Sequence, residues 1–351
     1  MDNISLIGID IAKNVFHMRA VNHRGRAFVD SKVSRLKLLE KVVEASSSKS
    51  VIAMEACGTS HYWGREFQKL GYEVKLVAPK FVKPFVKSHK NDKADAEAIV
   101  EAASRDSMRF VAVKTEVQQS IQSIHRVRTR LVKNRTQLTN ELRSLLAEFG
   151  LIIPKGKAAF KKSVAKILGG EFPEIPSILK EIARDLNNEF SQLETRIKSY
   201  EKLLKQVEKD NPTCKELSTI PGIGMMTATA LFASYGRGSQ FKNGRAMSAS
   251  LGLVPNQHSS GGTSRLGKVS KRGDSYLRQL LVHGARSVLR TSHKHKDPYN
   301  LWATSLRDAK GYNKASVALA NRNARIAWAI LSKGESFSPN YFKKEVSMQN
   351  N

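Results

Sequence analysis

Two adjacent serines and a run of cations give the segment Pro255–Asp274, PNQHSSGGTSRLGKVSKRGD, a composition suited to phosphate chemistry. Ser259 and Ser260 stand directly before two glycines, and four cations follow them: Arg265, Lys268, Lys271 and Arg272. Hydroxyls, a glycine backbone that can approach a bulky partner, and positive charge together suit a phosphodiester. The same composition is typical of a basic surface loop with Ser-Gly turns, so the segment alone leaves both interpretations open.

Four carboxylates far upstream suggest a metal site. Asp10 and Glu55 each follow an apolar run, so both are expected at strand ends, where neighbouring strands can bring them to one ion. Asp92 and Asp95 are spaced i, i+3 and share one helix face. Clustered carboxylates repel each other unless a hard cation neutralises them, and Mg²⁺ prefers oxygen ligands. The acids therefore predict a Mg²⁺ site, with two lysines beside the helical pair to steer or hold phosphate: Lys90 and Lys93.

Each acid also has an ordinary interpretation. Asp10 suits a turn and Glu55 a surface position, while Asp92 suits a helix cap and Asp95 a favourable place near the helix dipole. The conjunction of all four, in a chain with 31 acids against 59 Lys and Arg, favours a shared site.

Composition restricts the class of partner. A formal net charge of +28 over 351 residues predicts a polyanionic partner, nucleic acid above all, and the length predicts two or three domains. No lipidation signal, leader-type apolar core or run of ~20 apolar residues occurs, so we expect no membrane role and a cytoplasmic location. Cys57 and Cys214 are far apart, which excludes a zinc ribbon and a disulfide framework.

The elements expected in the first third follow the order βββαβαβα, which predicts an α/β layer with a mixed sheet. The first three strands form an antiparallel meander over Ile4–Ile11, Val15–Val21 and Arg26–Val29. The further strands are Val51–Met54 and Tyr72–Val77, and the helices are Ser34–Ala45, His61–Leu70 and Asp92–Ala103.

The middle of the chain has heptad-like apolar spacing over Val117–Phe149 and Ile175–Val207, with a shorter basic segment, Lys157–Lys166, between them. This spacing predicts a coiled-coil arm of two long helices, formed within the chain or between chains. Two seam positions hold Arg128 and Arg135. Either these arginines form a solvated or snorkelling face, or they contact RNA or DNA phosphates together with the neighbouring cations Arg126, Arg130 and Lys133.

The last third is expected to be mostly helical. Pro221-Gly222-Ile223-Gly224 between two apolar stretches predicts a helical hairpin in which the amides of Gly222 and Gly224 can approach a phosphate. Helices are expected over Leu277–Leu289 and Ala315–Leu331, followed by a polar tail from Ser336.

Five motifs together resemble one known family. GIDIAK at 8–13, AMEACG at 53–58 and KNDKADAEAI at 90–99 resemble the RuvC-like DEDD domain of the one-ten family of insertion-sequence transposases, which includes the Piv-type DNA invertases. LSTIPGIGMMTATALFASYG at 217–236 resembles the helix-hairpin-helix segment of that family, and GLVPNQHSSGG with KVSKRGDSYLRQLL resembles its serine-bearing block. The resemblance runs from Ser5 to Leu331. Cys57 departs from it, since a small residue or Thr is expected there.

This resemblance implies an architecture and a mechanism. The fold would be an α/β RNase H-like (RuvC-like) domain at 1–113, a coiled-coil arm at 114–210, a mostly α-helical serine-bearing domain with a helix-hairpin-helix at 211–335, and a tail at 336–351. Asp10, Glu55, Asp92 and Asp95 would hold Mg²⁺. A serine would become covalently joined to DNA: Ser260 when the motif is counted from Pro255, or Ser259 when it is counted from the downstream lysines.

The resemblance also implies partners. These are donor and target DNA, a structured bridge RNA that pairs with both, and further copies of the chain, as a dimer that pairs to a tetramer on the bacterial nucleoid. Two other functions remain: a Holliday-junction nuclease that uses the four acids and water, and a non-catalytic DNA-binding protein. The four intact acids argue against the latter, and their conjunction with Ser-Gly-Gly argues against the former.

Overall fold

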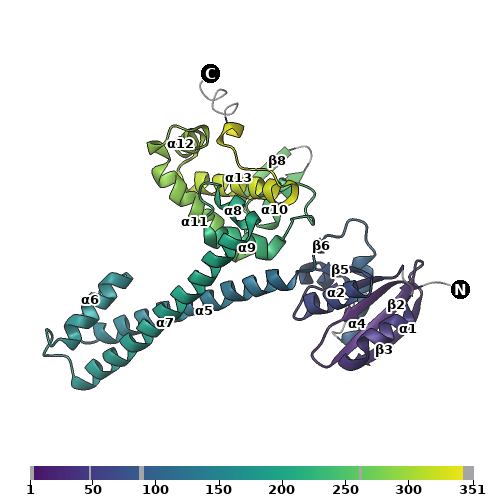
Figure 1. Cartoon of the computed structure of the whole chain (residues 1–351), viewed down its shortest axis with the longest axis horizontal. Coiled ribbons are helices and arrows are strands. Elements are labelled where there is room, and N and C mark those ends of the chain that lie inside the picture. Colours follow the sequence, from purple (N-terminus) through teal and green to yellow (C-terminus); the bar gives the residue numbers. More distant parts are fainter. Residues whose placement is uncertain (1–3, 47–48, 87–90, 261–262, 343–351) are drawn as a thin grey trace. The chain divides into compact units, whose positions relative to one another are not determined.

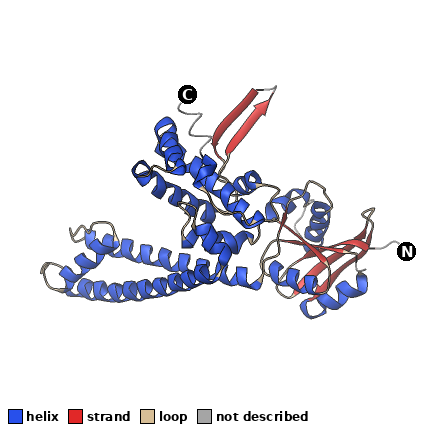
Figure 2. Ribbon diagram, turned by 45° about the horizontal axis from the view of Figure 1, so that its top comes forward, coloured by secondary structure: helices blue, strands red, loops and turns tan. Residues whose placement is uncertain are grey.

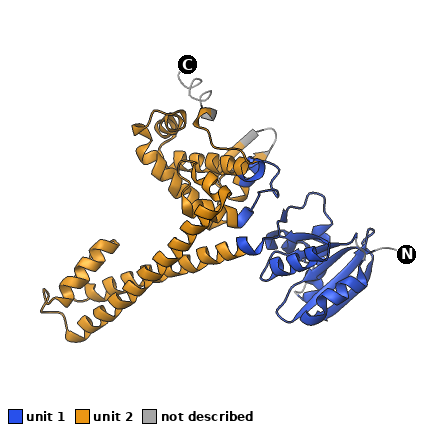
Figure 3. Ribbon diagram, viewed as in Figure 1, with its two compact units in different colours: residues 1–118, 234–247, 331–333 blue, residues 119–233, 248–330, 334–351 orange. Residues whose placement is uncertain are grey.

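The computed structural model describes residues 4–46, 49–86, 91–260 and 263–342, and Figure 1 labels most of their helices and several of their strands. The chain forms two compact units (Figure 3). The first comprises residues 1–118, 234–247 and 331–333, and the second comprises residues 119–233, 248–330 and 334–351. No helix in the described ranges is long and apolar enough to cross a membrane.

The first unit is built on a mixed sheet in the order β3-β2-β1-β4-β5-β6 (Figure 2). β1, β2 and β3 are antiparallel, β4 is parallel to both β1 and β5, and β6 is antiparallel to β5. The predicted meander and mixed α/β layer are thus confirmed, although β3 continues past the predicted end at Val29. The strands are β1 (Ile4–Asp10), β2 (Val15–Asn22), β3 (Ala27–Ser34), β4 (Val51–Glu55), β5 (Glu73–Val77) and β6 (Phe110–Val111).

Helices pack on both faces of this sheet: α1 (Leu38–Ala45), α2 (Ser60–Lys69), α3 (Pro79–Val82) and α4 (Asp92–Ala103). Successive residues of a strand face opposite sides. Ile7 and Ile9 of β1 accordingly join a buried cluster with residues of α1 and α2, whereas Gly8 between them faces α4. A Cβ at Gly8 would lie 2.5 Å from Val100 Cγ2 and 3.0 Å from the Ala96 carbonyl oxygen, so glycine lets α4 lie directly against β1.

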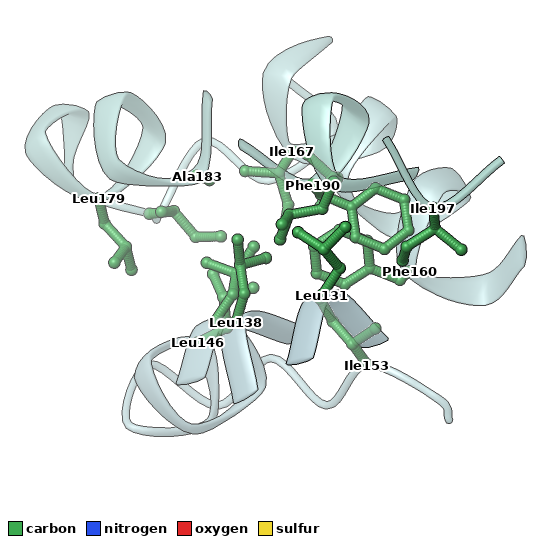
Figure 4. Packing of buried hydrophobic residues seen from close by; sticks show 14 residues of the cluster. Leu131, Leu138, Leu146, Ile153, Phe160, Ile167, Leu179, Ala183, Phe190 and Ile197 are labelled. Atoms are coloured by element: carbon green, nitrogen blue, oxygen red, sulfur yellow. The ribbon is translucent and has the colours of Figure 1, made fainter. Parts of the chain in front are cut away.

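The predicted long helices are present in the second unit as α5 (Glu116–Ala147), whose first residues belong to the first unit, and α7 (Ser177–Asp210). Between them in sequence lies α6 (Lys157–Leu168), which is more than the expected basic segment because its apolar face is buried. One cluster of buried side chains joins the three helices (Figure 4), including Leu131, Leu138, Leu142, Leu146, Phe160, Val164, Ile167, Leu179, Phe190 and Ile197.

Ion pairs fix the register of α5 against α7. Arg128 binds Glu201, with Nη2 to Oε1 at 2.6 Å, and Arg135 binds Glu194. Moving seven residues forward on α5 therefore corresponds to moving seven residues back on α7, as in an antiparallel pair. The structure thus gives these arginines a contact that neither interpretation included, with acids of the partner helix, and their contact with phosphate stays a prediction.

The remainder of the second unit is mostly helical, as expected. Its elements are α8 (Pro212–Ser218), α9 (Met225–Tyr235), α10 (Gly244–Ser250), β7 (Pro255–Ser260), β8 (Thr263–Val269), α11 (Ser275–Thr291), α12 (Pro298–Lys310) and α13 (Tyr312–Lys333). One end of α9 and one end of α10 belong to the first unit. The serine segment, expected as a glycine-supported loop, forms instead an antiparallel two-stranded ribbon, β7–β8. These strands could not be predicted from alternating apolar residues, because the described side chains of the ribbon are largely exposed.

The turn between α8 and α9 is held by close backbone packing. Gly222 has φ +87°, and a Cβ on Gly284 of α11 would lie 1.7 Å from the Gly222 carbonyl oxygen. The Pro221 carbonyl accepts a hydrogen bond from Asn323 Nδ2 at 2.9 Å, and Tyr299 Oη lies 2.9 Å from Asn323 Oδ1. The predicted turn is therefore part of the core of its unit.

Candidate active site

The sheet brings Asp10 and Glu55 to one edge. Asp10 is the last residue of β1 and Glu55 the last residue of β4. These strands are parallel neighbours, with Ile9 opposite Met54. Carboxyl ends of parallel neighbours meet at the same edge of a sheet, so both carboxylates lie where the sequence places them.

The first turn of α4 supplies the other two acids. Asn91 caps this helix, since its Oδ1 accepts a hydrogen bond from the Ala94 amide at 2.8 Å. The alternative role of Asp92 as the cap is therefore wrong, and the carboxylates of Asp92 and Asp95 remain available in the first turn. The close approach of α4 to β1 at Gly8 keeps this turn near the end of β1.

Three of the acids act electrostatically on the fourth, Asp10. Burial, followed by the carboxylates of Asp95, Asp92 and Glu55, raises the pKa of Asp10 to about 6, while His17 opposes the shift. Like charges raise a carboxyl pKa only when they lie close to it. Asp95, Asp92 and Glu55 therefore influence Asp10, and a metal site shared by the four acids stays a prediction.

Cys57 lies beside the same acids. Burial, with the charges of Glu55 and Asp10, raises the pKa of its thiol. A thiol that stays protonated is a poor nucleophile, so nothing in the described surroundings of Cys57 marks this departure from the family motif as a reactive residue.

No three His, Cys, Asp or Glu side chains in the described ranges are arranged to hold a metal ion. Asp10 and the three carboxylates that raise its pKa nevertheless offer only oxygen donors, which a hard divalent cation prefers, so a shared metal site stays a prediction.

The structure describes only one of the two lysines predicted to hold phosphate beside the acids. Lys90 lies outside the described residues. Lys93 is described, and its Nζ lies 3.2 Å from Oδ2 of Asp30 on β3. Lys93 therefore has a protein partner in the first unit, and its expected contact with phosphate stays a prediction.

Both serines belong to the strand β7. Ser259 is exposed, and its Oγ accepts a hydrogen bond from Gln257 Nε2 at 2.9 Å. Ser260 ends β7, but its side chain and the following Gly261-Gly262 lie outside the described part of the chain. His258, exposed on β7, lies directly opposite Arg265 on β8.

The predicted cations around the ribbon are all exposed. Arg265 and Lys268 lie on β8, and Lys271 and Arg272 lie in the connection to α11. Lys271 has φ +53°, a left-handed conformation that few non-glycine residues adopt. Arg278 of α11 holds this connection, donating from Nη1 to the carbonyl of Leu251 at 3.0 Å, and to that of Arg272 at 3.3 Å.

The arm retains an exposed basic face. Arg126, Arg130 and Lys133 of α5 are exposed and follow a spacing of four and three, so they share one side of the helix. Arg128 and Arg135 are turned instead to acids of α7. Gly224 is exposed at the start of α9, whereas Gly222 is packed against Gly284; phosphate contacts of both glycines stay predictions.

The buried imidazole of His125 could not be predicted from the sequence as a polar contact. His125 of α5 is 3% exposed, with Nδ1 2.9 Å from Tyr276 Oη on α11 and Nε2 3.0 Å from Thr229 Oγ1 on α9. Thr229 Oγ1 donates to the Met225 carbonyl, so it accepts from His125 Nε2. The histidine ties the arm to the helix that follows the ribbon. A single His on a helix gives no signal of partners more than one hundred residues away.

Comparison with known proteins defines the class. Residues 7–150 match a family model described as a transposase, of the DEDD type, and residues 214–300 match a second model described as the transposase IS116/IS110/IS902 family. The mixed α/β fold of the first unit is thus compatible with a DEDD transposase domain.

Full-length relatives extend the match. A probable family 20 transposase of Pseudomonas aeruginosa is 45% identical over 96% of this chain and 99% of its own length. The transposase for insertion sequence element IS1111A of Coxiella burnetii is 43% identical over 96% of this chain and 92% of its own. The transposase for IS1328 of Yersinia enterocolitica is 40% identical over 96% of this chain and all of its own. The chain belongs to the IS116/IS110/IS902 family of transposases, which confirms the resemblance drawn from its motifs.

Proposed function

We propose that the chain is a recombinase of an insertion sequence, which cleaves and exchanges DNA strands by phosphoryl transfer. The observation that supports this proposal is that Asp10 and Glu55 end neighbouring parallel strands, and that the carboxylates of Asp95, Asp92 and Glu55 raise the pKa of Asp10. Family membership and the charge of +28 support DNA as the substrate.

In the proposed site, Asp10, Glu55, Asp92 and Asp95 hold Mg²⁺. When bound, the ion supplies charge stabilisation to the phosphoryl and leaving oxygens. The first unit, as a RuvC-like domain, contributes rigidity: strand ends carry two of the acids, and the capped first turn of α4 carries the others.

The nucleophile is proposed to be Ser260, acting on the same phosphodiester as the acids. Its Oγ forms a bond to phosphorus, the bond from phosphorus to one deoxyribose oxygen breaks, and the serine proton ends on that leaving oxygen. A covalent serine–DNA ester conserves the energy of the broken bond, so strands can be rejoined. The hydrogen bond from Gln257 to Ser259 supports Ser259 as the residue that shapes the ribbon.

Nucleic-acid contacts are assigned to exposed cations. Those of the ribbon and of its connection to α11, Arg265, Lys268, Lys271 and Arg272, would contact DNA near the serine. The basic face of the arm, Arg126, Arg130 and Lys133, would contact the phosphates of a structured guide RNA, whose pairing reads the sequence. We propose domains at 1–113, 114–210 and 211–335 with a tail at 336–351, and a dimer that pairs to a tetramer on two DNAs.

The test is a search for protein–DNA adducts. Purified protein, element-end DNA, the transcribed guide RNA and Mg²⁺ are incubated, denatured and resolved, and adducts are mapped by mass spectrometry. Ser260→Ala should abolish both adduct and strand exchange while retaining DNA binding, whereas Ser259→Ala should retain activity. Asp10→Asn should abolish cleavage.

Two outcomes contradict the assignment in different ways. An adduct on Ser259 would exchange the roles of the two serines. Nicking by Ser260→Ala protein without any adduct would make water the nucleophile and favour a junction nuclease that uses the acids alone.

A further inference from the structure

Asp30 of β3 binds three basic side chains at once. Its Oδ1 lies 2.6 Å from His17 Nε2, and its Oδ2 lies 2.6 Å from Arg19 Nη1 and 3.2 Å from Lys93 Nζ. His17 and Arg19 come from β2, and Lys93 comes from α4. These contacts lower the pKa of Asp30, so it is a carboxylate at neutral pH.

The first of these contacts reaches Asp10. His17 is directly opposite Asp10 in the pairing of β1 with β2, and directly opposed residues of a sheet share one face. The histidine is 6% exposed, and in the described part of the chain its Nδ1 is buried with no hydrogen-bond partner. The Asp30 carboxylate is thus the group that orients this imidazole beside Asp10.

A second contact reaches the other acids. Lys93 stands between Asp92 and Asp95 in the first turn of α4. Its ion pair with Asp30 ties this turn to β3, two strands away from the β1 strand that carries Asp10. One carboxylate therefore holds a neighbour of Asp10 and the turn that carries both helical acids.

Asp30 is not itself suited to be a fifth ligand. Both of its oxygens are occupied by basic groups, and a metal ion would have to displace His17 or Arg19. Its charge instead pairs with that of Lys93, whose ammonium would otherwise be free to pair with the neighbouring acids of the cluster.

We propose that Asp30 is a positioning residue for the acid cluster: through His17 and Lys93 it sets the spacing of Asp10 from the first turn of α4. This inference rests on the proposed metal-dependent function. Groups that orient metal ligands typically change metal affinity by 10–100-fold when they are mutated.

The experiment has one arm with metal and one without. Mn²⁺ binding to the full-length protein is measured by electron paramagnetic resonance, and amide exchange of peptides covering residues 92–100 is measured in EDTA. Asp30→Asn should weaken Mn²⁺ binding about tenfold and speed exchange in these peptides. Lys93→Met should act in the same direction, and the double variant should lose less than the sum of the two changes. Asp106→Asn removes an exposed acid beyond α4 and is the matched control for charge.

The outcomes separate this inference from the proposed function. Unchanged Mn²⁺ affinity and unchanged exchange in folded Asp30→Asn protein would overturn the positioning role, as would equal losses in Asp106→Asn. A wild-type protein that binds no Mn²⁺, with exchange still faster in Asp30→Asn, would instead overturn the metal site and keep only the tie between α4 and β3. Recovery of affinity in Asp30→Glu, relative to Asp30→Asn, would support the role of the carboxylate.

Discussion

Replacing Gly8 by alanine should separate α4 from β1. The added methyl would lie 2.5 Å from Val100 Cγ2, 3.0 Å from the Ala96 carbonyl oxygen and 3.3 Å from the Val100 amide nitrogen. Carbon atoms in favourable contact lie about 3.5–4.0 Å apart. Val100 can move its side chain, but the Ala96 carbonyl belongs to the helix backbone, so α4 itself must shift by several tenths of an ångström.

The expected magnitude follows from two opposing effects. An extra methylene in a packed core costs about 1–3 kcal/mol, while replacing glycine by alanine stabilises by about 0.4–1 kcal/mol through the unfolded chain. Gly8→Ala should therefore lower the free energy of unfolding of the first unit by about 1–2 kcal/mol. Val100→Ala removes one of the three contacts, so combining it with Gly8→Ala should cost less than the sum of the two single changes.

The assay needs a signal from the first unit alone. Trp63 is buried in the α1–α2 side of the sheet, and the other two tryptophans, Trp302 and Trp328, lie in the second unit. With both of these changed to Phe, Trp63 fluorescence in urea reports unfolding of the sheet.

Gly58→Ala is the control for this measurement, because its Cβ would meet no atom within 4 Å and Gly58 has no positive φ. An unchanged urea midpoint for Gly8→Ala, or an equal loss for Gly58→Ala, would refute the packing argument.

Three further predictions concern the second unit and nucleic-acid binding. Burial and the charge of Arg128 lower the pKa of His125 to about 4. Between pH 6.5 and pH 4, the imidazole therefore takes up a proton only in the unfolded chain, and the free energy of unfolding should fall by about 3 kcal/mol as the pH drops through this range. His125→Gln should abolish this contribution to the pH dependence. Leu138→Asp should speed amide exchange over α5 and α7, because it buries a charge, whereas Gln137→Asp at the exposed neighbouring position should not. DNA affinity should fall steeply with salt, with a slope of log K against log salt of about −0.9 for each phosphate contacted; a flat titration would contradict a backbone-dominated interface.

Elements with strong periodicity could be predicted from the sequence. Apolar residues that recur at periods of two, or of three and four, made it possible to predict the meander, the parallel strands and the two long helices. The acids could be predicted for a related reason: Asp10 and Glu55 directly follow apolar runs that must be strands, so their place at one edge of the sheet follows from topology.

Other features depend on contacts that local sequence does not encode. The β7–β8 ribbon lacks alternating apolar residues since it has no core face, and its Ser-Gly-Gly resembles a loop. Asp30 lies one residue past the predicted end of its strand, so its contacts with β2 and α4 could not be predicted. The acids that bind Arg128 and Arg135 lie on a helix 73 and 59 residues away along the chain, respectively.

The paired ion contacts of the arm restrict how its length can change during evolution. Deleting one residue from α5 would turn the rest of the helix by about 100° and shift it by about 1.5 Å, which would break the pairing of Arg135 with Glu194. Adding seven residues to α5 and seven to α7 would preserve both the apolar stripe and the pairing, and would lengthen the arm by about 10 Å. We therefore expect the arms of relatives to differ by insertions or deletions of seven residues made in both helices together. Insertions of other lengths should occur in the connections on either side of α6.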